Sequence, residues 1–228
     1  MNNKQHFLES GYRAFKNVVH AEELEYFRTL FDDFVKGTYD LKVQEDPSET
    51  KLKSKKASKL TFINKPSLYV PELLTSKTYQ KVIKIAKELM GDDMELDFDI
   101  MENKIPGSAA AGSWLQDASR WPELTDKRAI SFSIALDDTD KENGCMMYLH
   151  GSHHKPLSNL QDTPTVSPVT DDLADGNEDI VYGEIPSGSA IAHHGNTLYA
   201  SLGNTSKKRK CRMLLLTLRP KSMIQGKK

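Results

Sequence analysis

The first part of the chain carries helical periodicity. Between residues 20 and 37, apolar residues recur at steps of three and four, acidic residues follow the start, and Gly37 ends the segment, which predicts an amphipathic helix. A second helix is predicted before Gly91, because Thr75 or Ser76 can cap its first turn and its apolar positions form one stripe. Both segments therefore predict helices that bury one face.

After Gly91 the period of the hydrophobic pattern changes to two residues. In ELDFDIMEN (residues 95–103) apolar and acidic side chains alternate, which indicates a strand with one buried face. Short, β-rich segments separated by turn residues follow at 128–136, 145–149, 180–185, 189–194 and 212–218. Helices followed by many short strands predict an α+β, mainly β fold, in which N-terminal helices flank an antiparallel sandwich or barrel. We expect one domain over residues 1–228, helical to about 92 and with a β core from about 93 to 220.

Two segments predict loops. Residues 50–59 are rich in lysine and serine, which indicates a mobile loop. Residues 155–178 are rich in proline, aspartate and threonine, which predicts a long excursion of the kind that serves as a lid or binding loop.

Composition narrows the classes of partner. The 228 residues contain 31 basic and 32 acidic side chains, so no global field favours nucleic acid, and the basic clusters at 51–59 and 207–212 are interpreted as solvated loops. The apolar runs are too short for a membrane-spanning helix, which needs about 20 residues. Two cysteines and the lack of an apolar leader predict a cytoplasmic protein with no nucleic-acid or membrane partner.

Three sequence motifs occur in a particular order along the chain. They are GSWLQDASRWPEL (112–124), ENGCMMYLHGSHH (142–154) and HHGNTLYASLGNTS (193–206). In this order and spacing they resemble the phytanoyl-CoA dioxygenase family of iron and 2-oxoglutarate oxygenases, and residues 11–31 are similar to that family's entry into its first helix. The resemblance implies a double-stranded β-helix, a cupin-like jelly roll whose mouth holds the active site.

The iron site implied by the resemblance is altered in this chain. The family binds Fe(II) through two histidines and one carboxylate, and the corresponding positions here are Leu115, Asp117 and Tyr199. Leucine has no lone pair, and a neutral phenol is a poor ligand for Fe(II). We therefore expect no cofactor. An alternative keeps Fe(II) and 2-oxoglutarate, with Asp117, His193 and His194 as a rescued ligand set.

The resemblance also implies an anion clamp at the start of the last strand. There the family uses an arginine to bind the distal carboxylate of 2-oxoglutarate. The candidates here are Arg212 and Lys210, and the register leaves Cys211 open as well. Lys104 matches a lysine that the family often carries near the cosubstrate; it is equally explained as a strand-end charge that reaches solvent.

The altered cavity suggests chemistry without iron. Asp117 and Tyr199 are the candidate catalytic pair, because a carboxylate and a nearby phenol can act as general base and acid. Burial is expected to raise the pKa of Asp117. The expected pocket residues are Trp114, Leu115, Trp121, Lys104 and Ser201.

These residues lead to three functional hypotheses. The first is a metal-independent isomerase, lyase or cyclase, or a binder, that acts on a small-molecule metabolite. The second is an Fe(II)- and 2-oxoglutarate-dependent hydroxylase with a non-standard ligand set. The third is a non-catalytic accessory subunit that forms a heterodimer with an intact paralogue, and a homodimer is also considered. All three place the function in a family whose substrates include small natural products.

Overall fold

The computed structural model describes residues 1–39, 60–108, 111–120, 126–155 and 179–225. The predicted loop at 50–59 and nearly all of the predicted excursion at 155–178 lie outside these residues. In the described part of the chain, no helix is long and apolar enough to cross a membrane.

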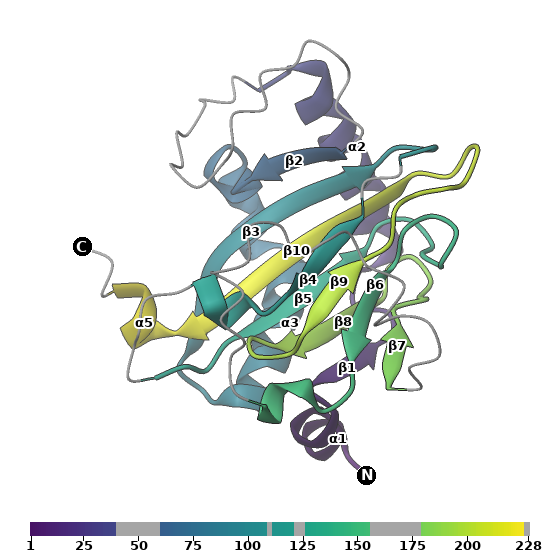
Figure 1. The fold of residues 1–228 in the computed structure, drawn as a ribbon. Coiled ribbons are helices and arrows are strands. Elements are labelled where there is room, and N and C mark those ends of the chain that lie inside the picture. The colour runs from purple at the N-terminus through teal and green to yellow at the C-terminus, as the bar shows by residue number, and fades with distance from the viewer. Residues whose placement is uncertain (40–59, 109–110, 121–125, 156–178, 226–228) are drawn as a thin grey trace.

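The strands form two antiparallel sheets (Figure 1). The larger sheet has the order β1-β8-β5-β10-β3-β2, and the smaller has the order β4-β9-β6-β7. The larger sheet consists of β1 (Tyr12–Phe15), β2 (Leu60–Asn64), β3 (Met94–Lys104), β5 (Ile130–Ala135), β8 (Ala190–His194) and β10 (Cys211–Pro220). The smaller consists of β4 (Gly112–Leu115), β6 (Met146–Leu149), β7 (Ile180–Tyr182) and β9 (Tyr199–Ser201).

Short helices complete the fold. The α-helices are α1 (Asn3–Ser10), α2 (Ala21–Lys36), α3 (Lys77–Met90) and α5 (Lys221–Gln225), and the 3-10 helices are η1 (Pro66–Leu68), η2 (Pro71–Thr75), η3 (Asp117–Arg120) and η4 (Ser152–His154). The predicted cap of α3 forms, since the Ser76 side chain accepts a hydrogen bond from the backbone N–H of Tyr79. The mainly β prediction is confirmed.

The larger sheet presents two different faces because side chains alternate along its strands. Phe132 and Ile134 of β5 belong to the main hydrophobic core, which also contains the apolar stripes of α2 and α3. Ser131 and Ser133 therefore point the other way, toward the smaller sheet, and so does Thr217 of β10. The helices lie on one side of the larger sheet and the smaller sheet on the other (Figure 1). The main apolar core thus lies between the helices and the larger sheet, and polar side chains lie between the two sheets.

Strands begin earlier in the chain than the sequence indicated. β1 pairs with β8, and β2 pairs with β3, so both edges of the larger sheet come from the region expected to be helical. A four- or five-residue strand at a sheet edge gives too short a pattern to separate from a loop.

Candidate active site

Three polar side chains form a row across the inner face of the larger sheet. His193 on β8 lies opposite Ser131 on β5, which in turn lies opposite Thr217 on β10. The hydroxyls of Ser131 and Thr217 are 2.9 Å apart. All three side chains are buried, so the row is a polar floor beneath the smaller sheet.

The smaller sheet supplies a second row that faces the first. Leu115 on β4 pairs with Tyr199 on β9, which pairs with Tyr148 on β6. The ring of His193 lies 4.5 Å from that of Tyr199 and 5.4 Å from that of Tyr148, measured between centroids. The two rows therefore meet at His193.

Asp117 joins the two rows. It begins η3 just after β4, and its Oδ1 accepts a hydrogen bond of 2.7 Å from the hydroxyl of Tyr199. Its Oδ2 accepts one of 2.7 Å from Ser131 and lies 3.4 Å from Nε2 of His193. The side chain is only 16% exposed. The residues that the sequence singled out at 117 and 199 thus touch, and His193 touches Asp117 as well.

The environment of Asp117 keeps it ionised. Burial raises the pKa of this carboxyl, but the adjacent imidazole of His193 and the hydrogen bonds from Tyr199 and Ser131 outweigh it, so the pKa lies below its ordinary value. Burial acts in the expected direction, but the net pKa of Asp117 is lowered rather than raised. Two hydroxyl donors and a nearby imidazole, from three different strands, compensate the lost hydration.

His194 does not reach Asp117. Neighbouring residues in a strand point to opposite faces, and the ring of His194 lies on the outer side, 6.4 Å from the Phe7 ring and 5.4 Å from the His153 ring. Its Nδ1 accepts a hydrogen bond from the backbone N–H of Asn196. Of the two histidines in the rescued ligand set, the structure brings only His193 to the carboxylate.

The position of His194 predicts a pH-dependent stability. Burial lowers its pKa from 6.5 to about 4, so the unfolded chain binds the extra proton more readily. The contribution is fully present above about pH 6.5 and is lost as the pH falls to about 4, which amounts to about 3 kcal/mol. We expect urea unfolding of His194→Gln to lack this part of the pH dependence. The exposed His20 provides the control, and a His20→Gln variant with the same loss would contradict the assignment.

The other expected pocket residues are distributed over both faces of the smaller sheet. Leu115 shares the inner row with Tyr199, whereas Trp114 packs against Met147, Ile180 and Ala200 in a separate cluster. Alternation along β4 explains the difference, because adjacent side chains face opposite ways. Ser201 on β9 accepts a hydrogen bond of 3.1 Å from the Gly112 N–H. Trp121 lies outside the described residues.

The three expected anion-binding cations are engaged elsewhere. Lys104 is buried and donates to the carbonyls of Gly144 and Leu202 at 2.8 and 3.0 Å. Arg212 makes a two-pronged contact with Asp137, and Lys210 lies 3.4 Å from Asp32. Their role as anion binders stays a prediction.

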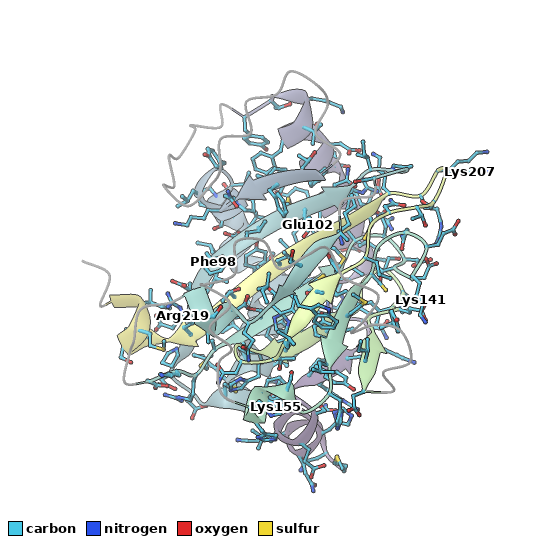
Figure 2. The ribbon with its side chains drawn as sticks, viewed as in Figure 1. Phe98, Glu102, Lys141, Lys155, Lys207 and Arg219 are labelled. Atoms are coloured by element: carbon cyan, nitrogen blue, oxygen red, sulfur yellow. The ribbon has the colours of Figure 1, made fainter. Side chains whose placement is uncertain are left out.

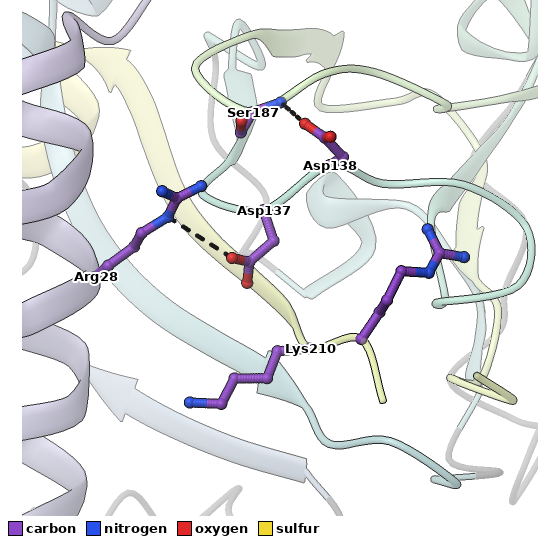
Figure 3. A pocket seen from close by; sticks show the side chains of 6 residues that line it. Arg28, Asp137, Asp138, Ser187 and Lys210 are labelled. Atoms are coloured by element: carbon purple, nitrogen blue, oxygen red, sulfur yellow. Dashed lines mark hydrogen bonds and ion pairs between the residues drawn. The ribbon is translucent and has the colours of Figure 1, made fainter. Parts of the chain in front are cut away.

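A surface pocket lies near the start of β10 (Figure 3). Its volume is about 280 Å³, and it is lined by Arg28, Asp137, Asp138, Ser187, Arg209 and Lys210. Each basic side chain in it is paired with a carboxylate. Lys210 precedes Thr217 by a length of strand of about 20 Å, so this pocket is separate from the Asp117 cluster. Its charges are satisfied, and we do not assign it a catalytic role.

Two facing antiparallel sheets with a polar cluster between them define the jelly-roll class of 2-oxoglutarate oxygenase-like proteins. The chain belongs to the Phytanoyl-CoA dioxygenase (PhyH) family, whose model matches residues 7–211. The family and the jelly-roll fold implied by the three sequence motifs are thereby confirmed.

Relatives and solved structures agree with this assignment. A probable alpha-ketoglutarate-dependent hypophosphite dioxygenase of Stutzerimonas stutzeri is 24% identical over 220 residues, which cover 93% of this chain and 76% of the relative. EvdO2 from Micromonospora carbonacea var. aurantiaca, solved with 2-oxoglutarate, has a TM-score of 0.73 and 22% identity over 96% of this chain and 89% of its own. The non-heme alpha ketoglutarate dependent epimerase SnoN from nogalamycin biosynthesis has a TM-score of 0.74 and 16% identity, covering 96% and 79%. The chain spans between 48% and 76% of the length of the curated relatives that it matches.

These comparisons correct the expectation of no cofactor. The hypophosphite dioxygenase and SnoN are alpha-ketoglutarate-dependent by name, and EvdO2 was solved with 2-oxoglutarate. These relatives and neighbours indicate Fe(II) and 2-oxoglutarate as the cofactors of this fold. The expectation, drawn from the two missing histidines alone, was wrong. Loss of the ligands at these two positions does not by itself exclude a cofactor.

The side chains at the site do not reproduce the two-histidine, one-carboxylate set. Leu115 has no donor atom, and the phenol of Tyr199 is hydrogen-bonded to Asp117 rather than replacing an imidazole. In the described ranges, no group of three His, Cys, Asp or Glu side chains is arranged to hold a metal ion. The residues present therefore do not fit the family's iron site, and we derive the chemistry from the side chains themselves.

Proposed function

We propose that this PhyH-family protein is an enzyme that converts a small molecule to an isomer by proton transfer at Asp117, with Tyr199 and His193 as its partners. The observation that carries the proposal is the buried but ionised carboxylate, which accepts hydrogen bonds from Tyr199 and Ser131 and lies 3.4 Å from His193. Such a cluster holds and moves a proton.

The geometry gives each side chain a part in that step. The Asp117 carboxylate takes a proton from one atom of the substrate, and the resulting carboxyl group, after exchange with solvent, returns a proton at the position that defines the isomer. The Tyr199 hydroxyl, which donates to Oδ1, keeps the carboxylate in place. His193 lies beside Oδ2, where an imidazole N–H can orient the carboxylate and stabilise its charge. Ser131 fixes Oδ2 from the floor of the cavity.

The lowered pKa of Asp117 restricts the protons that it can remove. A weak base works on strongly acidic hydrogens, since proton transfer is efficient when the pKa values of donor and acceptor are close. Hydrogens next to a positive charge meet this condition. The site therefore suits isomerisation or cyclisation through a positively charged species.

The structural neighbours support a reaction that yields an isomer. SnoN is a non-heme alpha ketoglutarate dependent epimerase, and SnoK, which has a TM-score of 0.71, is a carbocyclase from the same biosynthesis. Both names show that this fold serves reactions other than hydroxylation. Fe(II) and 2-oxoglutarate are therefore included in the test.

The proposal predicts isomer formation with uptake of solvent hydrogen. We would incubate purified protein in D₂O with a small-molecule extract of the source organism, with and without added Fe(II) and 2-oxoglutarate, and follow metabolites by mass spectrometry. The expected result is a protein-dependent isomeric product that carries deuterium.

Two outcomes would overturn this proposal. One is a product that gains an oxygen atom while 2-oxoglutarate is converted to succinate, which would establish the hydroxylase instead. The other is no protein-dependent product in any arm. Comparing the incubations with and without added Fe(II) and 2-oxoglutarate also shows how far the reaction depends on these cofactors.

A further inference from the structure

The charge of Asp117 is not balanced by a lysine or arginine in the described part of the chain. The carboxylate lies beside the imidazole of His193 and accepts hydrogen bonds from the neutral hydroxyls of Tyr199 and Ser131. A carboxylate that is mostly removed from water is costly unless a positive group approaches it. The cluster therefore attracts positive charge.

Two hydrogen-bond acceptors in the cluster have spare capacity. Oδ1 of Asp117 accepts a hydrogen bond from Tyr199, whereas a carboxylate oxygen can accept two. His193 is 2% exposed, and its Nδ1 has no hydrogen-bond partner among the described residues. Nε2 of His193 lies 3.4 Å from Oδ2 of Asp117, and with the imidazole proton assigned to that nitrogen, Nδ1 is left as an acceptor. A ligand with two or more N–H groups matches this pair.

Aromatic rings line the same space. Tyr199 and Tyr148 flank His193, and Leu115 lies beside Tyr199. The face of a tyrosine ring attracts a cation within about 6 Å of its centroid. Tyr199, Leu115 and Asp117 are partly exposed, so the cluster is open to solvent on their side. The surroundings of Asp117 thus combine one negative charge with tyrosine rings, a combination that suits an organic cation.

We propose that the Asp117 cluster binds the cationic nitrogen of an organic amine, a primary or secondary ammonium group that donates to Asp117 and to Nδ1 of His193. This inference rests on the proposed function and names its substrate class. A metal ion shares the positive charge, but the site offers it one carboxylate and one imidazole with an apolar Leu115, too few donors for a stable complex.

The test compares small probes of the same shape and different charge. Piperidine, charged at neutral pH, is compared with tetrahydropyran, its neutral ring analogue, and with cyclohexanecarboxylate, by ligand-observed NMR on the full chain at pH 7. We expect piperidine to bind about ten-fold more tightly than tetrahydropyran, and cyclohexanecarboxylate not to bind. A parallel titration with Mn(II) tests whether a divalent metal ion binds to the same site.

Variants assign the preference to the carboxylate. Asp117→Asn should remove it, so that piperidine and tetrahydropyran bind within about two-fold of each other. Urea unfolding of Asp117→Asn shows whether the variant is folded under the binding conditions, which guards against a folding defect as the cause of the lost preference. The exposed Asp92 gives the matched control, and Asp92→Asn should bind like the wild type.

Three results would overturn the inference. They are equal binding of the charged and neutral probes, a preference that survives in Asp117→Asn, and Mn(II) that binds and displaces piperidine. Each leaves the proposed function standing if deuterated isomers still form. Conversely, a clear preference for piperidine without isomer formation supports the ligand class and refutes the reaction.

Discussion

The Asp117→Asn variant should form the deuterated isomer at least about 100-fold more slowly than the wild type, because loss of a positioned acid–base group typically costs this much or more. Asparagine keeps the shape of the side chain and can still accept the Ser131 hydroxyl. It removes the negative charge and cannot take up a proton. The rate of deuterium incorporation per mole of protein measures the effect.

Asp92→Asn serves as the matched control, since this exposed turn residue has no part in the cluster and should leave the rate unchanged. Urea unfolding of both variants establishes that each is folded under assay conditions. A folded Asp117→Asn protein with a rate within about three-fold of the wild type would show that Asp117 does not move the proton, given the typical cost of losing such a group.

Much of the fold follows from local sequence patterns. The strand predicted at 95–103 is the centre of β3, and the alternation in residues 128–136 produces β5. These segments are long and strictly periodic, so the hydrophobic pattern determines them. β1 and β2 were missed because pairing with β8 and β3, rather than their own sequence, makes them strands.

The site was only partly predictable. The spacing within the three sequence motifs identified Asp117 and Tyr199, which the structure places in contact. The floor of the cluster was missed, although a signal existed: Ser131 occupies the face opposite Phe132, and Thr217 interrupts an apolar run. That these residues meet depends on the register of β8, β5 and β10, which local sequence does not specify. The direction of the Asp117 pKa shift depends on those same contacts.

We expect Asp97→Asn to lower the free energy of unfolding by about 3–5 kcal/mol, the usual cost of leaving one partner of a buried ion pair uncompensated. Asp97 pairs with Arg219, and their side chains are 6% and 0% exposed. The register between β3 and β10 shifts beside Asp97, from Thr217 opposite Phe98 to Leu218 opposite Leu96. Such a bulge redirects a side chain, and here Arg219 lies near the end of β10 beside α5 (Figure 2). Urea unfolding at pH 7 measures the loss.

Glu95 gives a matched control on the same strand. It pairs with Lys221 at 3.4 Å, but the two side chains are 47% and 56% exposed, so Glu95→Gln should cost less than about 1 kcal/mol. A double variant, Asp97→Leu with Arg219→Met, separates the charge from the packing, because replacing both partners by apolar side chains is often neutral or stabilising. If the double variant is as unstable as Asp97→Asn, the loss comes from packing at the bulge; recovery to near wild-type stability identifies the uncompensated Arg219 charge as its cause.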